Sequence, residues 1–546
     1  MAALSKVIVA ASDGVRERPR WLVLSLAGAA FVLIWGLPTI VIPLATDQVL
    51  FSLGARTVLH GQALYTDLWD IKPPLIYFIY TVPFALVGEH MEAVRVLDLV
   101  NTFLAMTGIF LLSRRLFSER AAIISAAFYG FAYLTWATVD GLGEVESFMA
   151  APLAFALFVY VPEDGHRTEA PRAALAGLLL GAVFALKTAG VLFVLGLPAA
   201  ELLLRPEGRW TPAGAARRLG MAAAGFLVVQ LALLLYLAAM GALSDFIDIQ
   251  RHYTLPYNRY RFTGAEGSEL RFLLAGTSDW IKDNTFIVVP AAVALFFGFF
   301  RREHARALGL LAFLALVAVA MVWWQGKMFR YHWLIMLPVL ALLAGYAADQ
   351  AVGLFAKLPQ REQRAANALL ALALIVFAYP PLIATYDNYR TLVSYADGTL
   401  DRRDVEARYL PLYRTNHQLV DYIRANGGPD DRVFIWGFWP IDFFWLDRPL
   451  VDRFVFNSGL RATWAPDSWR RELIDDLTAA PPRFFVVARG DNQPWLSGTT
   501  QTSDEHLRDS FPEIQRFLEQ GYAPVQDMGL FVLYERNPAA VQRPPR

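Results

Sequence analysis

TDQVLF at residues 46–51 and YTDLWDIKPPLIYF at residues 65–78 decide how the rest of this chain is organised. The two segments place Asp47, Asp70 and Lys72 between an apolar run long enough to cross a membrane and a shorter apolar run. Burying an unpaired charge close to lipid costs free energy. A chain that keeps carboxylates and a lysine at this point must therefore use them, either to hold a turn or to carry out chemistry.

The composition is that of a membrane protein. Of the 546 residues, 56% are hydrophobic and only 18% are charged, whereas about a quarter are charged in soluble proteins. The formal net charge is zero, which gives no support to a nucleic-acid partner. The chain has no cysteine, so disulfides, thiolate metal sites and a cysteine nucleophile are excluded.

The basic loops set the predicted topology, because about 20 apolar residues cross a bilayer and short basic loops stay in the cytoplasm. Residues 21–43 follow a basic N-terminal segment and are predicted to be a signal anchor. Residues 75–88 are too short to cross and are predicted to be a helix on the membrane surface. Residues 44–92 then form the first external loop.

The later spans follow the same alternation. Residues 173–203 are too long for one span and are interrupted at Lys187, so we predict a hairpin of two short spans with its tip outside. This arrangement gives about eleven transmembrane helices within residues 1–386, in the cytoplasmic (inner) membrane. The predicted spans are 21–43, 94–112, 121–138, 147–161, 173–203 (two), 219–241, 286–300, 307–324, 333–353 and 365–384.

Residues 387–546 have the composition of a soluble domain, which the topology places outside the membrane, on the same side as residues 44–92. Short apolar strand candidates alternate there with amphipathic stretches, a pattern that predicts a small α/β domain. The predicted strands are 432–437, 483–488 and 530–536, and the predicted helical stretches are 412–426 and 504–520. A cluster of aromatic residues at 436–445 is more typical of a domain core or dock than of sugar stacking.

Ionisable and aromatic side chains gather at the predicted outer ends of the spans. A convergence at one depth and on one side indicates a cavity at the membrane–water interface, suited to joining a lipid-borne substrate to something outside. The set is Asp47, Asp67, Asp70, Lys72, Asp140, Glu144, Glu146, Lys187, His252, Tyr257, Arg259, Tyr260, Arg261, Lys327, Arg330 and His332.

Asp47-Gln48 followed by GQALYTDLWDIKPPL at 61–75 resembles the first external loop of the GT-C superfamily of glycosyltransferases. The resemblance is to the branch of the protein O-mannosyltransferases and the lipid A aminoarabinose transferases. Three further pieces are similar: the acidic loop with Glu144 and Glu146, GKMFRYHWLIMLPVLALLAG at 326–345, and VFIWGFWPIDFFWLDRPLVDRF at 433–454. The family often has Asp-Glu where this chain has Asp47-Gln48, so a divalent metal stays possible but is not argued from sequence.

The resemblance implies a GT-C-type all-α membrane domain with juxtamembrane helices. It also implies inverting transfer of a sugar from a polyprenyl-phosphate donor to a hydroxyl of a lipid, glycan or protein acceptor. Asp47 is the expected general base, since a positioned base contributes about 10²–10⁴ in rate. Lys72 is expected to neutralise the leaving lipid phosphate.

The other candidate residues fall into three groups. Glu146 is the second catalytic candidate. Contacts with the donor phosphate or lipid are expected from Lys187, Lys327, Arg330, His332 and Tyr77. Contacts with the sugar or acceptor are expected from Asp70, Glu144, Tyr257, Arg259 and Tyr260.

Each role has a structural alternative. Asp47 would be an ordinary N-cap if the following helix began beside it. Asp67 and Asp70 flank Leu-Trp as turn residues do. Lys72 would otherwise reach to lipid headgroups, and Lys327 would anchor the outer face together with Arg330.

Two other functions compete with glycosyl transfer from a monophosphate. A polysaccharide polymerase or oligosaccharide ligase using a diphosphate-linked donor would need a larger acceptor groove and more arginine at the phosphate. A transporter would have charges near the bilayer midplane and two similar halves, and no internal repeat is visible in the sequence.

Overall fold

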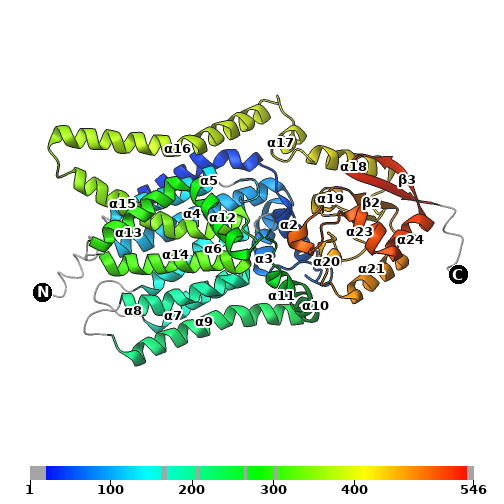
Figure 1. The fold of residues 1–546 in the computed structure, drawn as a ribbon, viewed down its shortest axis with the longest axis horizontal. Coiled ribbons are helices and arrows are strands. Elements are labelled where there is room, and N and C mark those ends of the chain that lie inside the picture. Colours follow the sequence, from blue (N-terminus) through cyan, green and yellow to red (C-terminus); the bar gives the residue numbers. More distant parts are fainter. Residues whose placement is uncertain are drawn as a thin grey trace.

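The computed structural model describes residues 20–136, 138–161, 169–204, 210–263, 267–300 and 304–537. A bundle of long helices forms one part of the molecule, and a smaller domain that contains the sheet forms the other (Figure 1). The basic N-terminal segment predicted to be cytoplasmic lies outside the described residues.

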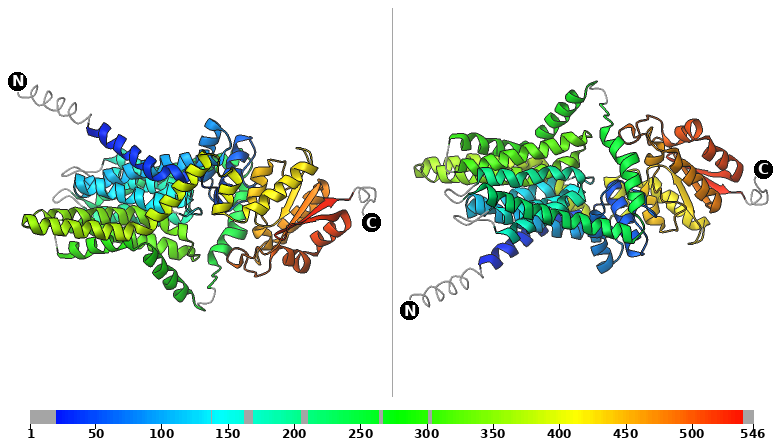
Figure 2. Two further views of the ribbon diagram at one scale, coloured as in Figure 1. Left: turned by 90° about the horizontal axis from the view of Figure 1, so that it is seen from above. Right: turned by 90° about the horizontal axis from the view of Figure 1, so that it is seen from below.

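The bundle helices run side by side, roughly along the long axis of the molecule (Figures 1 and 2). Six helices of the described part are long and apolar enough to cross a membrane, which makes this a multi-pass membrane protein. They are Arg20–Val41, α4 (Met91–Leu116), α9 (Pro212–Ala239), α14 (Ala305–Gln325), Arg330–Phe355, which includes α15 (Leu337–Phe355), and α16 (Gln360–Ala396). The count of eleven spans stays a prediction.

Shorter helices complete the bundle. They are α5 (Glu119–Trp136), α6 (Val145–Tyr160), α7 (Ala170–Leu186), α8 (Gly196–Leu203) and α13 (Thr285–Phe300). The stretch 242–285 between the predicted spans 219–241 and 286–300 is expected from its polar sequence to be a large external loop, but it is largely helical, because short helices there satisfy their own backbone groups. It contains α10 (Leu243–Ile249), a π-helical turn (Gln250–Thr254), α11 (Leu255–Arg259) and α12 (Glu269–Asp283), which meets α13 at a bend of 98°.

The break predicted within residues 173–203 is present, whereas two membrane spans with the tip outside stay a prediction. The helix α7 ends at Leu186, and a 3₁₀ segment leads from Thr188 into α8. Lys187 at the tip pairs with Glu146 in the first turn of α6. Glu201 on α8 accepts a hydrogen bond of 2.8 Å from Tyr160, at the opposite end of α6. The chain therefore returns along the length of α6 after the break at Lys187.

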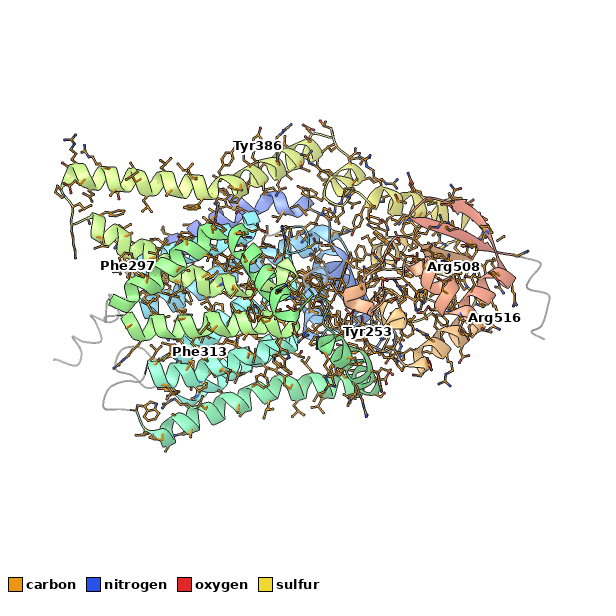
Figure 3. The ribbon with its side chains drawn as sticks, viewed as in Figure 1. Tyr253, Phe297, Phe313, Tyr386, Arg508 and Arg516 are labelled. Carbon is orange, nitrogen blue, oxygen red and sulfur yellow. The ribbon has the colours of Figure 1, made fainter. Side chains whose placement is uncertain are left out.

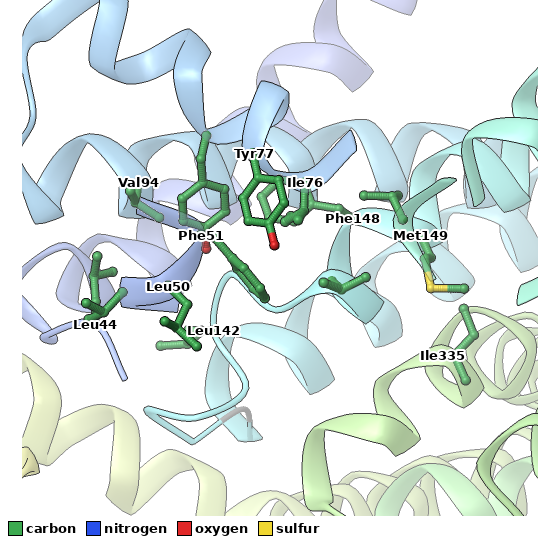
Figure 4. Close-up of a cluster of buried hydrophobic side chains, with 14 of the residues drawn as sticks. Leu44, Leu50, Phe51, Ile76, Tyr77, Val94, Leu142, Phe148, Met149 and Ile335 are labelled. Carbon is green, nitrogen blue, oxygen red and sulfur yellow. The ribbon is translucent and has the colours of Figure 1, made fainter. Parts of the chain in front are cut away.

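The segment 44–92 folds into two short helices, α2 (Thr46–Leu59) and α3 (Leu75–Val87). The apolar run at residues 75–88, which was predicted to form a helix, forms the helix α3. Figure 4 shows Phe51 of α2, Tyr77 of α3 and Phe148 of α6 in one cluster of buried side chains, in which the ring centroids of Phe51 and Tyr77 lie 6.4 Å apart. Gly54 lets the two helices approach closely, because a Cβ there would lie 2.2 Å from the Tyr77 ring.

The C-terminal domain contains a four-stranded sheet of order β1-β2-β4-β3. The strands β1 (Val433–Trp436), β2 (Phe484–Ala488) and β4 (Phe531–Arg536) confirm the three predicted ones. The prediction missed β3 (Tyr522–Asp527), because only Tyr522 of this edge strand is buried and its sequence carries no apolar alternation. β1 pairs parallel with β2, and the other two pairs are antiparallel.

Helices surround this sheet and link it to the bundle. The predicted stretch 412–426 is α18 (Tyr413–Asn426), and 504–520 is divided into α23 (Ser503–Ser510) and α24 (Pro512–Gly521). The helix α16 continues to Ala396, across the domain boundary predicted after residue 386. The remaining helices are α17 (Arg402–Tyr409), α19 (Pro440–Leu446), α20 (Ser458–Arg461), α21 (Asp467–Ala479) and α22 (Pro494–Ser497).

The loop between α2 and α3 joins the two parts of the molecule. The Trp69 backbone N–H donates to the Arg453 carbonyl at 2.8 Å, and the Arg453 guanidinium donates to the Tyr65 carbonyl at 2.9 Å. The Tyr413 hydroxyl donates to the Leu44 carbonyl at 2.8 Å. The C-terminal domain is thus fastened to the segment that carries the charged residues.

Candidate active site

A cavity of about 1020 Å³ lies where the α2–α3 segment, the hairpin tip, the π-helical turn and the C-terminal domain meet. Tyr253, which lines it, lies at the junction between the bundle and the C-terminal domain, whereas Phe297 and Phe313 lie along the bundle far from it (Figure 3). Eight of the predicted site residues line this cavity: Asp47, Asp70, Lys72, Lys187, Tyr257, Arg259, Lys327 and His332.

Asp47 and Lys72 form an ion pair at the cavity wall. The Lys72 ammonium donates to an Asp47 carboxylate oxygen at 2.8 Å, and the Tyr331 hydroxyl donates to the same oxygen at 3.3 Å. The N-cap of α2 is Ala45, and Asp47 lies inside the first turn. The alternative that Asp47 merely caps this helix is therefore wrong.

The charges of this pair stabilise each other. Burial by itself would raise the pKa of Asp47, but the Lys72 charge and hydrogen bond outweigh it and hold that pKa below its ordinary value. Burial would likewise lower the pKa of Lys72, but the Asp47 and Glu144 carboxylates raise it above its ordinary value. Asp47 is thus ionised and able to accept a proton.

Glu144 and Glu146 lie behind the cavity wall, at the N-terminal end of α6. Glu146 is 1% exposed and pairs with the Lys187 ammonium, which is 14% exposed and reaches the cavity. The Gln48 amide N–H faces a Glu144 carboxylate oxygen at 3.5 Å. Burial, followed by the nearby Asp47 charge, raises the pKa of Glu144 well above its ordinary value. The two glutamates therefore lie outside the cavity lining and support it.

Asp70 holds the loop that presents Lys72. Its carboxylate accepts from the Ile71 backbone N–H at 2.6 Å and from the Tyr77 hydroxyl at 2.7 Å. Tyr77 is fully buried, so it acts on Asp70 and does not reach the cavity where the lipid was expected to contact it. Asp67 is a turn residue, as its alternative predicted, because its carboxylate accepts from the Ala63 backbone N–H at 2.6 Å.

Aromatic rings surround Lys327 on the opposite wall. The Lys327 ammonium lies 4.1 Å from the Tyr257 ring centroid and 5.3 Å from that of Tyr260. It donates to the Tyr260 carbonyl at 3.0 Å and to the Trp495 carbonyl at 3.2 Å. Burial, together with the Arg261 charge, lowers the pKa of Lys327 to about 7.

Besides Glu144, Glu146 and Tyr77, the structure places two further predicted residues away from the cavity lining. Arg330 is 76% exposed and pairs with Asp283 at 3.3 Å, outside the cavity lining, and its expected contact with the donor phosphate stays a prediction. Tyr260 does not line the cavity, but it contacts a residue that does: its carbonyl accepts from Lys327 and its ring lies near the Lys327 ammonium. The Tyr260 ring also contacts Trp464. Arg259 is exposed at the cavity, as an acceptor contact would require.

Sequence reasoning missed several lining residues. Tyr331 and Gln250 line the cavity, and the C-terminal domain contributes Phe438, Gln493 and Trp495. Tyr331 lies between Arg330 and His332, both of which were predicted, so its neighbours were a usable signal. Gln493 is the N-cap of the short helix α22 and Trp495 lies within it, in a stretch with no motif, and only the fold brings them to the membrane domain.

No group of three or more His, Asp or Glu side chains suited to hold a metal ion occurs among the described residues. Near the acidic pair of α6, Gln48 contributes an N–H donor where the related pattern has a carboxylate. The Gln48 carbonyl oxygen accepts from Arg95 at 2.9 Å and from the Ala45 backbone N–H at 3.1 Å, which fixes the orientation of the amide.

The fold matches solved membrane enzymes over nearly the whole chain. ArnT from Cupriavidus metallidurans bound to undecaprenyl phosphate has a TM-score of 0.56 and 17% identity, covering 96% of this chain and 99% of its own. The same protein in the apo state has a TM-score of 0.59 and 15% identity, covering 97% and 100%. The Archaeoglobus fulgidus oligosaccharyltransferase in complex with Zn and sulfate has a TM-score of 0.52 and 13% identity, covering 94% and 73%.

The fold is therefore that of a GT-C membrane glycosyltransferase with a C-terminal α/β domain. Residues 71–234 also match the family model described as dolichyl-phosphate-mannose-protein mannosyltransferase. A search of curated proteins finds no match to this chain. The matched range includes the KPPL motif and begins after Asp47, and the similarity of fold extends over nearly the whole chain.

Proposed function

We propose that this protein is an inverting glycosyltransferase that moves a sugar from a polyprenyl-phosphate donor to an acceptor hydroxyl at the outer face of the cytoplasmic membrane. The observation that carries the proposal is the cavity in which the Asp47 carboxylate meets the ammonium groups of Lys72, Lys187 and Lys327. A base next to several cations suits attack by a hydroxyl with departure of a phosphate. The undecaprenyl phosphate bound to ArnT supports this class of donor.

Asp47 acts as the general base in this reaction. Its carboxylate takes the proton of the acceptor hydroxyl while the hydroxyl oxygen attacks the anomeric carbon from the side opposite the phosphate. The bond between that carbon and the phosphate oxygen breaks, and its electron pair leaves with the lipid phosphate. The phosphate is already a stable anion, so the reaction needs fixed positive charge and no general acid.

Donor binding strengthens the base. In the structure the Lys72 charge is shared with Asp47, and this pairing makes the carboxylate a weaker base. A lipid phosphate arriving in the cavity competes for the same ammonium. As Lys72 turns toward the phosphate, Asp47 loses part of its stabilisation and its pKa rises toward the value of an efficient base.

The positions of the basic residues support the proposed orientation in the membrane. Arg115 donates to the carbonyls of Phe158 and Val161, at the end of α6 that lies away from the cavity. Arg218 pairs with Glu201 at the same end of the hairpin. Basic residues prefer the cytoplasmic side, so the cavity and the C-terminal domain are expected on the outer side.

The test is transfer from radiolabelled polyprenyl-phosphate sugars into a membrane extract by the purified chain. Consumption of one monophosphate-linked donor, with product of inverted configuration, supports the proposal and identifies the sugar. The extraction behaviour of the product then separates lipid, glycan and protein acceptors. Consumption of only diphosphate-linked oligosaccharide would overturn the proposed donor in favour of a polymerase or ligase.

A further inference from the structure

The side chain of Lys187 pairs with one of the two glutamates at the start of α6. Glu144 and Glu146 lie at the N-terminal end of this helix, where the helix dipole favours negative charge. One Glu146 oxygen pairs with the Lys187 ammonium. Within the described structure, the second oxygen of each glutamate is buried and has no hydrogen-bond partner. The pair thus presents more acceptor capacity than a single lysine uses.

Paired carboxylates beside a phosphate site usually hold a divalent cation, which bridges them to the phosphate oxygens. The surroundings do not suit such an ion here. Gln48 turns an N–H toward Glu144, while Arg95 is fully buried behind Gln48 and bonds its carbonyl oxygen. Lys72 and Lys187 add two further fixed charges at the cavity. A divalent ion at this position would face the Gln48 N–H donor and three positive charges, those of Arg95, Lys72 and Lys187.

The backbone at the hairpin tip is built to deliver Lys187 to this position. Lys187 is the extended residue between α7 and the 3₁₀ segment, with φ −152° and ψ 121°. Its N–H donates to the Val183 carbonyl and its carbonyl accepts from Gly190, so the break is fixed on both sides. The Lys187 side chain therefore reaches the cavity wall at a fixed position, beside Glu146.

We propose that the Lys187 ammonium takes the position of a divalent cation between Glu146 and the donor phosphate, so that transfer needs no metal ion. An ammonium has three N–H donors, of which Glu146 engages one in the structure. The other two are free to point into the cavity and bind phosphate oxygens. This inference rests on the proposed function for the phosphate and says which group supplies its counter-charge.

The experiment measures Mn²⁺ binding by electron paramagnetic resonance on the purified full chain without substrate. We expect no stoichiometric Mn²⁺ binding by the wild type. Lys187→Met removes the charge at similar length, and we expect it to bind Mn²⁺ at least tenfold more tightly than the wild type. The matched double variant Lys187→Met/Glu146→Gln should lose that gain.

The outcomes separate this inference from the proposed function, because metal binding is measured without donor or acceptor. One Mn²⁺ bound per wild-type chain would overturn it, even if Lys187→Met failed to fold. A folded Lys187→Met variant that gains no Mn²⁺ affinity would also overturn it. In the transfer assay, wild-type activity that survives EDTA supports the inference, and activity abolished by EDTA and restored by Mn²⁺ contradicts it.

Discussion

The two walls of the cavity use positive charge in different ways. On the wall formed by the α2–α3 segment and the hairpin tip, each lysine is paired with a carboxylate: Lys72 with Asp47 and Lys187 with Glu146. On the wall formed by the π-helical turn, α11 and the C-terminal domain, Lys327 lies between tyrosine rings and donates only to carbonyls. No carboxylate among the described residues pairs with Lys327.

This difference indicates a division of work. A paired wall can exchange partners during a reaction, because an incoming phosphate can replace a carboxylate at a lysine, so that the lysine charge stays paired while the carboxylate is released. An aromatic wall with an unpaired lysine is better suited to hold a substrate group in place, by stacking and by a charge that depends on pH. We therefore expect chemistry on the first wall and recognition on the second.

The strongest test of the paired wall is Asp47→Asn, which keeps the shape and removes the base. We expect the rate of transfer to fall by at least about 10²-fold, because that is the contribution of a positioned general base. Undecaprenyl phosphate affinity should be kept or increased, since Lys72 is released. The measurement is single-turnover transfer with a radiolabelled donor, alongside donor binding.

Asp67→Asn is the matched control for that variant. Asp67 lies in the same loop but accepts only a turn hydrogen bond from Ala63, so its rate should stay within about twofold of the wild type. Full activity in Asp47→Asn would remove Asp47 as the base and move the search to Glu144 and Glu146.

Lys72→Met should mainly weaken donor binding. A charged hydrogen bond contributes about 1.5–3 kcal/mol, so the affinity for undecaprenyl phosphate should fall about 10- to 100-fold. Tryptophan fluorescence can report this binding, since Trp69, Trp324 and Trp495 line the cavity. A variant that binds donor normally but does not turn over would mean that Lys72 serves only Asp47.

How far the sequence predicts this architecture depends on the kind of signal. Long apolar runs, the break at Lys187 and the alternating strands β1, β2 and β4 were readable, because burial imposes a period on the sequence. The edge strand β3 could not be predicted in this way, since all of its residues except Tyr522 face solvent. The candidate side chains of the α2–α3 segment were found because burying an unpaired charge beside a membrane costs free energy, so charges at such a position indicate a role.

The rest of the site depends on tertiary contacts that no local pattern records. Tyr77 seemed suited to lipid, but its hydroxyl is used to orient Asp70. Trp495 comes from the short helix α22 after β2 and contacts Lys327 only because the C-terminal domain docks on the bundle. Local pattern placed the candidate residues near one end of the bundle, and folding decided which of them face the cavity.

The aromatic wall should give donor binding a dependence on pH. Lys327 has a pKa of about 7, so it is charged below pH 7 and neutral above it. We expect its contribution to phosphate affinity to fade as the pH rises from 6 to 8, about threefold to tenfold in affinity. Lys327→Arg stays charged across this range.

The affinity is measured with undecaprenyl phosphate, a monoester that gains a second charge with a pKa near 6. This change is the same in both measurements, so the comparison of the two proteins isolates Lys327. The ratio of the Lys327→Arg affinity to the wild-type affinity should therefore increase between pH 6 and pH 8. A constant ratio would show that Lys327 stays charged and that the two walls do not differ in this respect.

The smallest effect is expected from Arg330→Ala, which tests where the aromatic wall ends. Arg330 is only two residues from His332 in sequence, but its side chain is exposed and pairs with Asp283 outside the cavity. Exposed ion pairs contribute about 0–1 kcal/mol to stability, so folding and donor affinity should stay within about twofold of the wild type. A larger loss of donor affinity would mean that Arg330 swings into the cavity when the donor binds. The aromatic wall would then include a second cation besides Lys327, one that the structure places outside the cavity. The contrast between the aromatic wall and the paired wall would be smaller.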